Sequence, residues 1–192
     1  LIAGTTTTAT FTSTFTFNWE TLPADEFRLS RDMGGGSLLD LGWYCVRASL
    51  WAMQAWPQRV AATARWHNDV DLEFAAWMWF EGDRFASFDC GFQTVRRKWF
   101  EIAGTEASLV CDDFTRPWDA RQPRFWLHGP SGAMSTHTSS AVSQEVLMIE
   151  NFCRVVASGE LRQDWVDDAV ATQAVCAALD QAARSGQVVA LD

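Results

Sequence analysis

The sequence has few of the residue types on which common binding sites depend. Lysine and arginine number 15 against 24 acidic residues, the net charge is −9, and the densest basic stretch is only Arg96-Arg97-Lys98, which we interpret as one end of a strand. Phosphate contacts need clustered cations, so a nucleic-acid-binding surface is not expected. The three histidines, His67, His128 and His137, lie far apart and form no HxxxH or HxH pair. We therefore expect no metal site.

The cysteines lack the spacing of a metal or disulfide framework. None belongs to a CxxC pair, which favours a reducing cytoplasm. No apolar run is long enough to span a bilayer, and no secretory signal is recognisable. We expect a cytoplasmic protein that does not enter a membrane. The five cysteines are Cys45, Cys90, Cys111, Cys153 and Cys176.

Nucleotide-binding loops are also missing. No GxGxxG follows a predicted strand and no GxxxxGK[ST] occurs, and the glycines at 34–36 satisfy neither pattern. The chain begins at Leu1, and its first methionine is Met33. We interpret residues 1–192 as one domain of a longer protein, cut at a domain boundary, with a core of ordinary size.

Tyrosine is the scarcest aromatic residue, with one copy against 11 tryptophans and 13 phenylalanines. Tyr44 follows Gly34–Gly36, Ser37 and Asp40 on a predicted helix that ends near Trp56-Pro57. Ser37 is its expected N-cap and Asp40 the acidic partner of a capping box. Asp40, Tyr44 and Arg47 have the spacing of one helix face. Two interpretations are possible. Either the Tyr44 phenol takes part in proton transfer, or Asp40 only caps the helix and Tyr44 is a core aromatic whose hydroxyl has a hydrogen-bond partner.

An α+β fold is expected from the order of the remaining elements. Residues 5–17 alternate threonines with apolar side chains, as a strand does, and the apolar side should face the helices. Short turns such as Glu81-Gly82-Asp83 join further strands into a mostly antiparallel open sheet, with helices on one face. Predicted strands are 59–66, 72–80, 84–92, 98–103, 108–111, 124–128, 134–139 and 188–191, and predicted later helices are 143–157 and 166–184.

The second face of this sheet is expected to be covered. The strand at 72–80 carries large apolar side chains on both faces, including Trp77 and Trp79. A second copy of the chain is the simplest cover, as a homodimer or higher homo-oligomer. The alternative is that the loop at 112–123 folds over that face.

Three separated motifs resemble the C-terminal domain of the Gfo/Idh/MocA oxidoreductases. The first is Gly34-Gly35-Gly36-Ser37-Leu38-Leu39-Asp40-Leu41-Gly42-Trp43-Tyr44, preceded by Phe27-Arg28. The second is Phe100-Glu101-Ile102-Ala103-Gly104-Thr105-Glu106-Ala107-Ser108-Leu109, and the third is Ser185-Gly186-Gln187-Val188-Val189 after the last helix. Tyr44 followed by Cys45-Val46 is most similar to the dihydrodiol and NADP-dependent xylose dehydrogenase branch. Arg47 departs from many members, which have Asp there.

This resemblance implies a two-domain enzyme that transfers a hydride between NAD or NADP and a sugar, polyol or diol. A Rossmann domain, absent from this chain, would bind the cofactor and supply a lysine. The present chain would supply the substrate pocket and the dimer sheet. Tyr44 and Asp40 are the implied catalytic residues, and Arg28 and Trp43 the implied substrate-binding residues. The nearby lysine would favour the phenolate of Tyr44, since the reference pKa of tyrosine is ~10. Asp40 would orient that lysine or the substrate hydroxyl.

The sequence is also compatible with two other functions. The chain could be a non-catalytic oligomerisation or sugar-binding module with the same fold. It could also be a cofactor-free enzyme, although no nucleophile–base pair or metal cluster is visible in the sequence.

Overall fold

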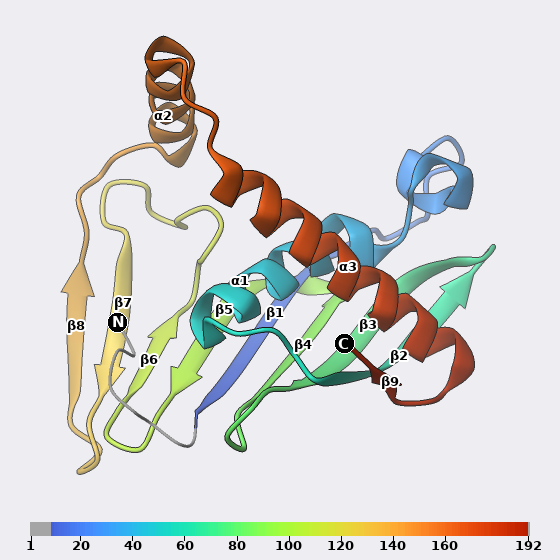
Figure 1. Ribbon diagram of the computed structural model, residues 1–192, viewed down its shortest axis with the longest axis horizontal. Helices are drawn as coiled ribbons and strands as arrows, with labels where there is room; N and C mark the ends of the chain where they lie inside the picture. Colours follow the sequence, from blue (N-terminus) through green and yellow to red (C-terminus); the bar gives the residue numbers. More distant parts are fainter. Residues whose placement is uncertain (1–8, 192) are drawn as a thin grey trace.

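Nine strands form one open sheet in the computed structural model, which describes residues 9–191 (Figure 1). The predicted strand at 5–17 is observed from Thr10, and residues 5–8 lie outside the described part. The strands are β1 (Thr10–Asn18), β2 (Arg59–His67), β3 (Val70–Trp79), β4 (Phe85–Gly91), β5 (Gln93–Ala103), β6 (Ser108–Cys111), β7 (Arg124–His128), β8 (Met134–Thr138) and β9 (Val189–Ala190). Their order across the sheet is β8-β7-β6-β5-β1-β4-β3-β2-β9.

The helices are α1 (Trp43–Met53), α2 (Gln144–Ser158) and α3 (Gln163–Ser185). Two short 3₁₀ turns, Phe27–Leu29 and Arg31–Met33, precede a π-helical turn at Leu38–Gly42. Helices α1 and α3 lie across the same face of the sheet, whereas α2 stands beyond its end (Figure 1). Only the β1–β4 pair is parallel among the described strand pairs. The expected α+β open sheet, mostly antiparallel with helices on one face, is confirmed.

Strand β1 lies at the centre of the sheet and separates an apolar from a polar face. Phe11 is fully buried in the core beneath the helices, and Phe15 packs against the same cluster. On the opposite face, Thr14 Oγ1 donates to Asp89 Oδ2 at 3.0 Å, and Thr16 Oγ1 donates to the Val95 carbonyl at 2.7 Å. The apolar side therefore faces the helices, as the alternating pattern predicts.

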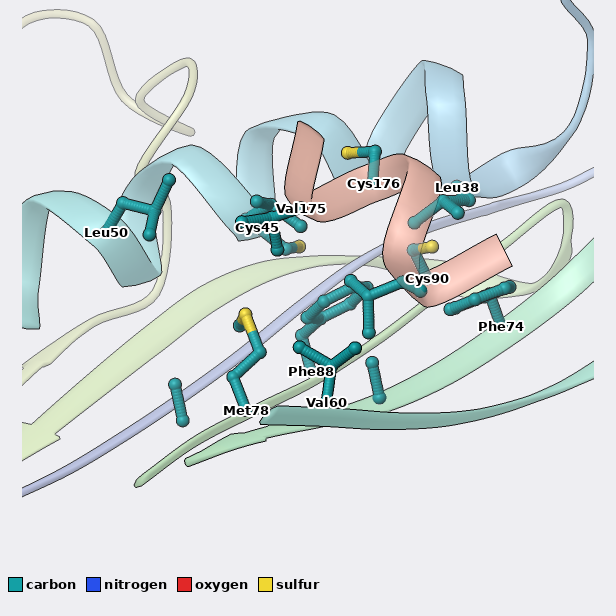
Figure 2. Close-up of a cluster of buried hydrophobic side chains, with 14 of the residues drawn as sticks. Leu38, Cys45, Leu50, Val60, Phe74, Met78, Phe88, Cys90, Val175 and Cys176 are labelled. Atoms are coloured by element: carbon teal, nitrogen blue, oxygen red, sulfur yellow. The ribbon is translucent and has the colours of Figure 1, made fainter. Parts of the chain in front are cut away.

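The core lies between the sheet and the two crossing helices. Figure 2 shows Cys45 of α1 and Cys176 of α3 above Phe74, Met78 and other sheet residues. Burial raises the pKa of both thiols to about 12, so each stays neutral and packs as a small apolar side chain. All five cysteines are free.

The predicted helix from Ser37 to Trp56 is divided and shorter than expected. Its first turn, Leu38–Gly42, is π-helical, and α1 ends at Met53 because Gln54 adopts a left-handed conformation with φ 49°. Gly42 packs closely on β4, where an added Cβ would lie 3.0 Å from the Cys90 Sγ. The widened turn thus coincides with a point where helix and sheet are in close contact.

Helix α2 has no buried residue. Six of its large apolar side chains are about half exposed or more, including the consecutive Val146, Leu147, Met148 and Ile149, with 47%, 48%, 65% and 57% exposure. A helix that is apolar on several sides normally lies inside a protein, so this surface is unusual. Within residues 9–191, no helix combines the length and apolarity that crossing a membrane requires.

Candidate functional site

The glycine run makes the turn that brings α1 onto the sheet. Gly34 and Gly36 have φ of 73° and 111°, in the region that favours glycine. An added Cβ at Gly36 would lie 2.2 Å from Asp71 Oδ1, and one at Gly35 would lie 2.5 Å from the Arg28 carbonyl oxygen. Backbone conformation and close contact therefore both require glycine in this turn.

Asp71 of β3 caps the start of this helix from a different part of the chain. Its Oδ2 accepts hydrogen bonds from the Ser37 hydroxyl at 2.6 Å and from the Leu38 N–H at 2.7 Å. Burial raises the pKa of Asp71, and these hydrogen bonds oppose the shift. The prediction that Ser37 is the N-cap is wrong, since Ser37 has helical dihedral angles and its hydroxyl donates to Asp71 instead of accepting from the helix.

Arg28 and Asp40 are brought together as an ion pair. Arg28 Nε lies 2.8 Å from Asp40 Oδ2, and Arg28 Nη1 lies 2.9 Å from Glu26 Oε1. Partial burial lowers the pKa of Arg28, but the two carboxylates outweigh it and raise the pKa. The guanidinium therefore stays charged, and its N–H groups that have no partner among residues 9–191 can bind oxygen atoms of a ligand.

Tyr44 presents its ring to solvent one turn after Asp40. The residue is 48% exposed, and its ring packs edge-on against Phe15 of β1, with centroids 5.6 Å apart. Its hydroxyl has no hydrogen-bond partner among residues 9–191. Tyr44 is thus not a core aromatic with a satisfied hydroxyl, which was the alternative interpretation of the sequence.

Trp43, the fourth residue of the predicted site, and Arg47, the third residue of the predicted polar stripe, both lie against the body of the domain. Trp43 is partly buried against the core, and its ring centroid lies 6.1 Å from that of Tyr44. Arg47 pairs with Asp168 of α3 and so links the two helices. The three residues of the predicted polar stripe therefore have different roles. Asp40 pairs with Arg28, Arg47 forms a structural ion pair, and Tyr44 remains the catalytic candidate.

A shallow cavity of about 650 Å³ opens beside Arg28. It lies between the end of β1 and the start of β5, and its lining comprises Phe17, Asn18, Trp19, Glu26, Arg28, Val95 and Arg96. Neither Tyr44 nor Asp40 lines it. Asp40 reaches the cavity only through its ion pair with Arg28, so the described residues alone do not enclose a complete pocket around the phenol.

Lys98 is a buried charged residue that sequence reasoning missed. The interpretation of Arg96-Arg97-Lys98 as a strand end is wrong, because β5 begins at Gln93 and these residues alternate across the sheet. Lys98 Nζ lies 2.6 Å from Asp113 Oδ1, and both side chains are less than 10% exposed. Lys98 is the only lysine in the sequence, a signal that could have singled it out.

The chemical resources of the site are a phenol, an ion pair and aromatic surfaces. Tyr44 can donate or accept a proton, and the Arg28–Asp40 pair can orient oxygen atoms. No group of three or more possible His, Cys, Asp or Glu metal ligands is present in the described part of the chain. This arrangement suits proton transfer to or from a hydroxyl or carbonyl group.

A family model described as the GFO/IDH/MocA C-terminal domain matches residues 6–110 of the chain. Among curated proteins, the chain is 26% identical over 185 residues to D-xylose 1-dehydrogenase (NADP(+)) 2 of Haloferax volcanii, covering 94% of this chain and 55% of that protein. It is also 26% identical over 168 residues to a dTDP-3,4-didehydro-2,6-dideoxy-α-D-glucose 3-reductase of Actinomadura kijaniata, covering 84% and 49%. The chain spans about half the length of these relatives.

Solved structures agree with this similarity. A 3-ketoreductase from Actinomadura kijaniata, in complex with NADP and TDP-benzene, superposes with a TM-score of 0.81 at 26% identity, covering 90% of this chain and 53% of that one. An aldose–aldose oxidoreductase from Caulobacter crescentus, complexed with glycerol, gives a TM-score of 0.79 at 19% identity, covering 95% and 55%. The second comparison shows a shared fold alone.

Proposed function

The chain belongs to the GFO/IDH/MocA C-terminal domain family, and we propose that it is the substrate-binding half of an NAD(P)-dependent oxidoreductase acting on a sugar, polyol or diol. The observation that carries this proposal is the half-exposed Tyr44, one helical turn after the Asp40 of the Arg28–Asp40 pair. The NADP-dependent function in the name of the Haloferax relative supports the cofactor class.

Interconversion of an alcohol and a carbonyl needs a hydride and a proton to move. The nicotinamide supplies or takes the hydride. The Tyr44 hydroxyl would exchange the proton with the substrate oxygen. Arg28, held by Asp40 and Glu26, would hold a neighbouring substrate hydroxyl, and Trp43, whose ring lies edge-on to that of Tyr44, would contact the substrate.

Residues 9–191 do not offer a phosphate cradle for the cofactor at the glycine turn. The glycine turn is closed around the Asp71 carboxylate, whose Oδ1 occupies the space beside Gly36. A carboxylate there would repel a diphosphate. We therefore assign cofactor binding to a second, Rossmann-type domain in the full-length protein.

The bare apolar surface of α2 supports such a second domain. Val146, Leu147, Met148 and Ile149 are all about half exposed or more, on a helix that stands beyond the sheet (Figure 1). Burying one large apolar side chain contributes about 1.5 to 3 kcal/mol. We assign this surface to the contact with the cofactor-binding domain.

Titration with cofactor tests whether this chain binds only the substrate and a second domain binds the cofactor. The 192-residue chain is expected not to bind NADH or NADPH at micromolar concentrations, because it lacks a glycine-rich phosphate loop. The full-length protein is expected to bind one of them and to reduce or oxidise a sugar, polyol or diol. Isothermal titration calorimetry measures both proteins under the same conditions. Micromolar binding to the chain alone would overturn the proposal.

We propose further that the outer face of the sheet forms a homodimer contact. Trp77 of β3 is 48% exposed on the face opposite the helices, and its ring lies 5.5 Å from that of Phe85. The loop at 112–123 does not cover this face, since its Phe114 packs against Phe15 and Phe100 on the helix-bearing side. A two-fold axis would place the same aromatic strip of two copies together.

Trp77→Lys is expected to shift the protein from dimer to monomer. A charge at the centre of the contact would have to be buried without a partner. Sedimentation velocity at tens of micromolar protein measures the mass of the wild type and of the variant. Trp51→Lys serves as the matched control, since Trp51 is 50% exposed on α1. A monomeric wild type, or a Trp77→Lys dimer as stable as the wild type, would show that the outer face is not the interface.

A further inference from the structure

A second cavity, of about 410 Å³, lies on the helix-bearing side of the sheet beneath the loop that joins β6 to β7. Its size falls within the usual range of small-molecule sites. Aromatic rings, carboxylates and amides contribute to its lining, among them Phe114, Trp118, Phe125, Asp113, Gln122 and Gln144. None of the sequence motifs includes this loop.

Asp113 brings a buried acceptor to the cavity. The residue is 8% exposed, and its Oδ1 lies 2.6 Å from Lys98 Nζ. Its Oδ2 is buried and accepts no hydrogen bond from residues 9–191. A buried carboxylate oxygen without a donor is costly, so a hydroxyl group that donated to it would be bound favourably.

Trp118 brings a flat apolar surface. The Lys98 ammonium lies 4.1 Å from the ring centroid, and Trp118 Nε1 donates to the Asp112 carbonyl at 3.0 Å. These two contacts fix the orientation of the indole, yet the residue remains 55% exposed. An exposed indole held in one orientation can stack on the apolar face of a ligand ring.

The charges around the cavity are balanced. Each carboxylate on its wall has a cation: Asp113 pairs with Lys98, Asp112 with Arg124 at 3.6 Å, and Asp119 with Arg121 at 3.3 Å. Within residues 9–191, the cavity wall therefore has no unpaired cation that could bind a phosphate group of a ligand. The hydroxyl groups and apolar ring faces of a neutral ligand match its polar and aromatic side chains. The ligand class that fits is a neutral, polyhydroxylated ring.

The cavity is connected to Tyr44 through aromatic rings. Phe114, on the cavity wall, lies edge-on to Phe15 with centroids 6.0 Å apart, and Phe15 lies 5.6 Å from Tyr44. A ligand in the cavity would therefore sit near the reacting group without occupying the same place.

We propose that this cavity is a subsite for a neutral sugar ring linked to the ring that reacts at Tyr44. The substrate would then be a disaccharide or other neutral glycoside, with one ring stacked on Trp118 and a hydroxyl donating to Asp113 Oδ2. This inference rests on the proposed function for the identity of the reacting ring, but the binding itself needs no cofactor.

Calorimetric titration with maltose, cellobiose, lactose and sucrose tests the subsite on the purified protein. At least one disaccharide is expected to bind more tightly than glucose and than UDP-glucose. Trp118→Ala and Asp113→Asn are each expected to weaken that binding about tenfold, corresponding to the loss of about 1.4 kcal/mol. Trp51→Ala, at an exposed tryptophan of α1 that does not line the cavity, is the control and should leave the affinity unchanged. Thermal melts check that the variants stay folded.

The outcomes separate the subsite from the catalytic proposal. No disaccharide binding at about 10 mM, or equal binding by wild type and a folded Trp118→Ala variant, would overturn the subsite. Preferential binding of UDP-glucose would overturn the neutral ligand class. Binding that depends on Trp118, together with full turnover of Tyr44→Phe, would leave the subsite standing and reject the catalytic role of Tyr44.

Discussion

Replacing Tyr44 with phenylalanine is expected to reduce the turnover of the full-length enzyme about a hundredfold or more, the usual loss when a general acid or base is removed. The substitution deletes one hydroxyl and keeps the ring that packs on Phe15. The affinity for NAD(P) should be nearly unchanged, because the proposed division of roles assigns cofactor binding to the Rossmann-type domain. Steady-state kinetics with the best sugar substrate, together with cofactor titration, measure both quantities.

Trp51→Phe is the matched control for this substitution. Trp51 lies on the same helix with 50% exposure, against 48% for Tyr44. Its replacement should leave turnover unchanged. Near-normal turnover of Tyr44→Phe would return Tyr44 to a structural role and would favour a sugar-binding or oligomerisation module over an enzyme domain.

Replacing Asp71 with alanine is expected to lower the free energy of unfolding by about 2 to 4 kcal/mol. The Ser37 hydroxyl and the Leu38 N–H would both lose their acceptor at the buried start of the helix. In a chain of this size the melting temperature should fall by about 5 to 15 °C. Differential scanning calorimetry of wild type and variant measures the change.

Asp71→Asn separates the loss of an acceptor from the loss of charge. The amide oxygen keeps one acceptor at the same place, so the cost at neutral pH should be about 1 kcal/mol or less. An equal loss of stability in both variants would show that the charge, rather than the hydrogen bonds, holds the turn.

The difference in stability between wild type and Asp71→Asn should depend on pH, and its direction follows from the pKa of Asp71. Burial raises the pKa of folded Asp71 above its unfolded value, so between the two values the folded state binds more protons. The contribution of Asp71 to stability therefore falls as pH rises through that window. Asp71→Asn lacks this titration, so its melting temperature relative to wild type should increase as pH rises from the ordinary aspartate range. A decrease would contradict this reading of Asp71.

Local sequence patterns predicted the elements, because the rules that form them are local. The alternation of β1 and the turn at Glu81-Gly82-Asp83 depend on neighbouring residues alone. The cap at Asp71 depends on a residue 34 positions away, and no local pattern reports it. The local pattern therefore predicts the helix but assigns its cap to Ser37 instead of Asp71.

The candidate site was predicted in part, for the same reason. The glycine turn, Asp40 and Tyr44 lie in one continuous motif, so their proximity follows from the helix. Lys98 and Asp113 come from a strand and a loop whose contact depends on the tertiary fold. From the sequence, Lys98 is interpreted as part of a strand end, because the sequence does not show that Asp113 pairs with it inside the fold.

The central position of β1 has a consequence for the order of folding during synthesis. Its partners are β4, where Thr12 meets Ser87 across 75 residues, and β5, where Thr10 lies opposite Ala103. A strand of alternating threonine and phenylalanine thus leaves the ribosome long before either neighbour exists. Such distant pairings slow folding and expose unpaired edges to other chains. The nascent chain should therefore depend on chaperone protection until β5 is complete, and should then close the middle of its sheet in one late step.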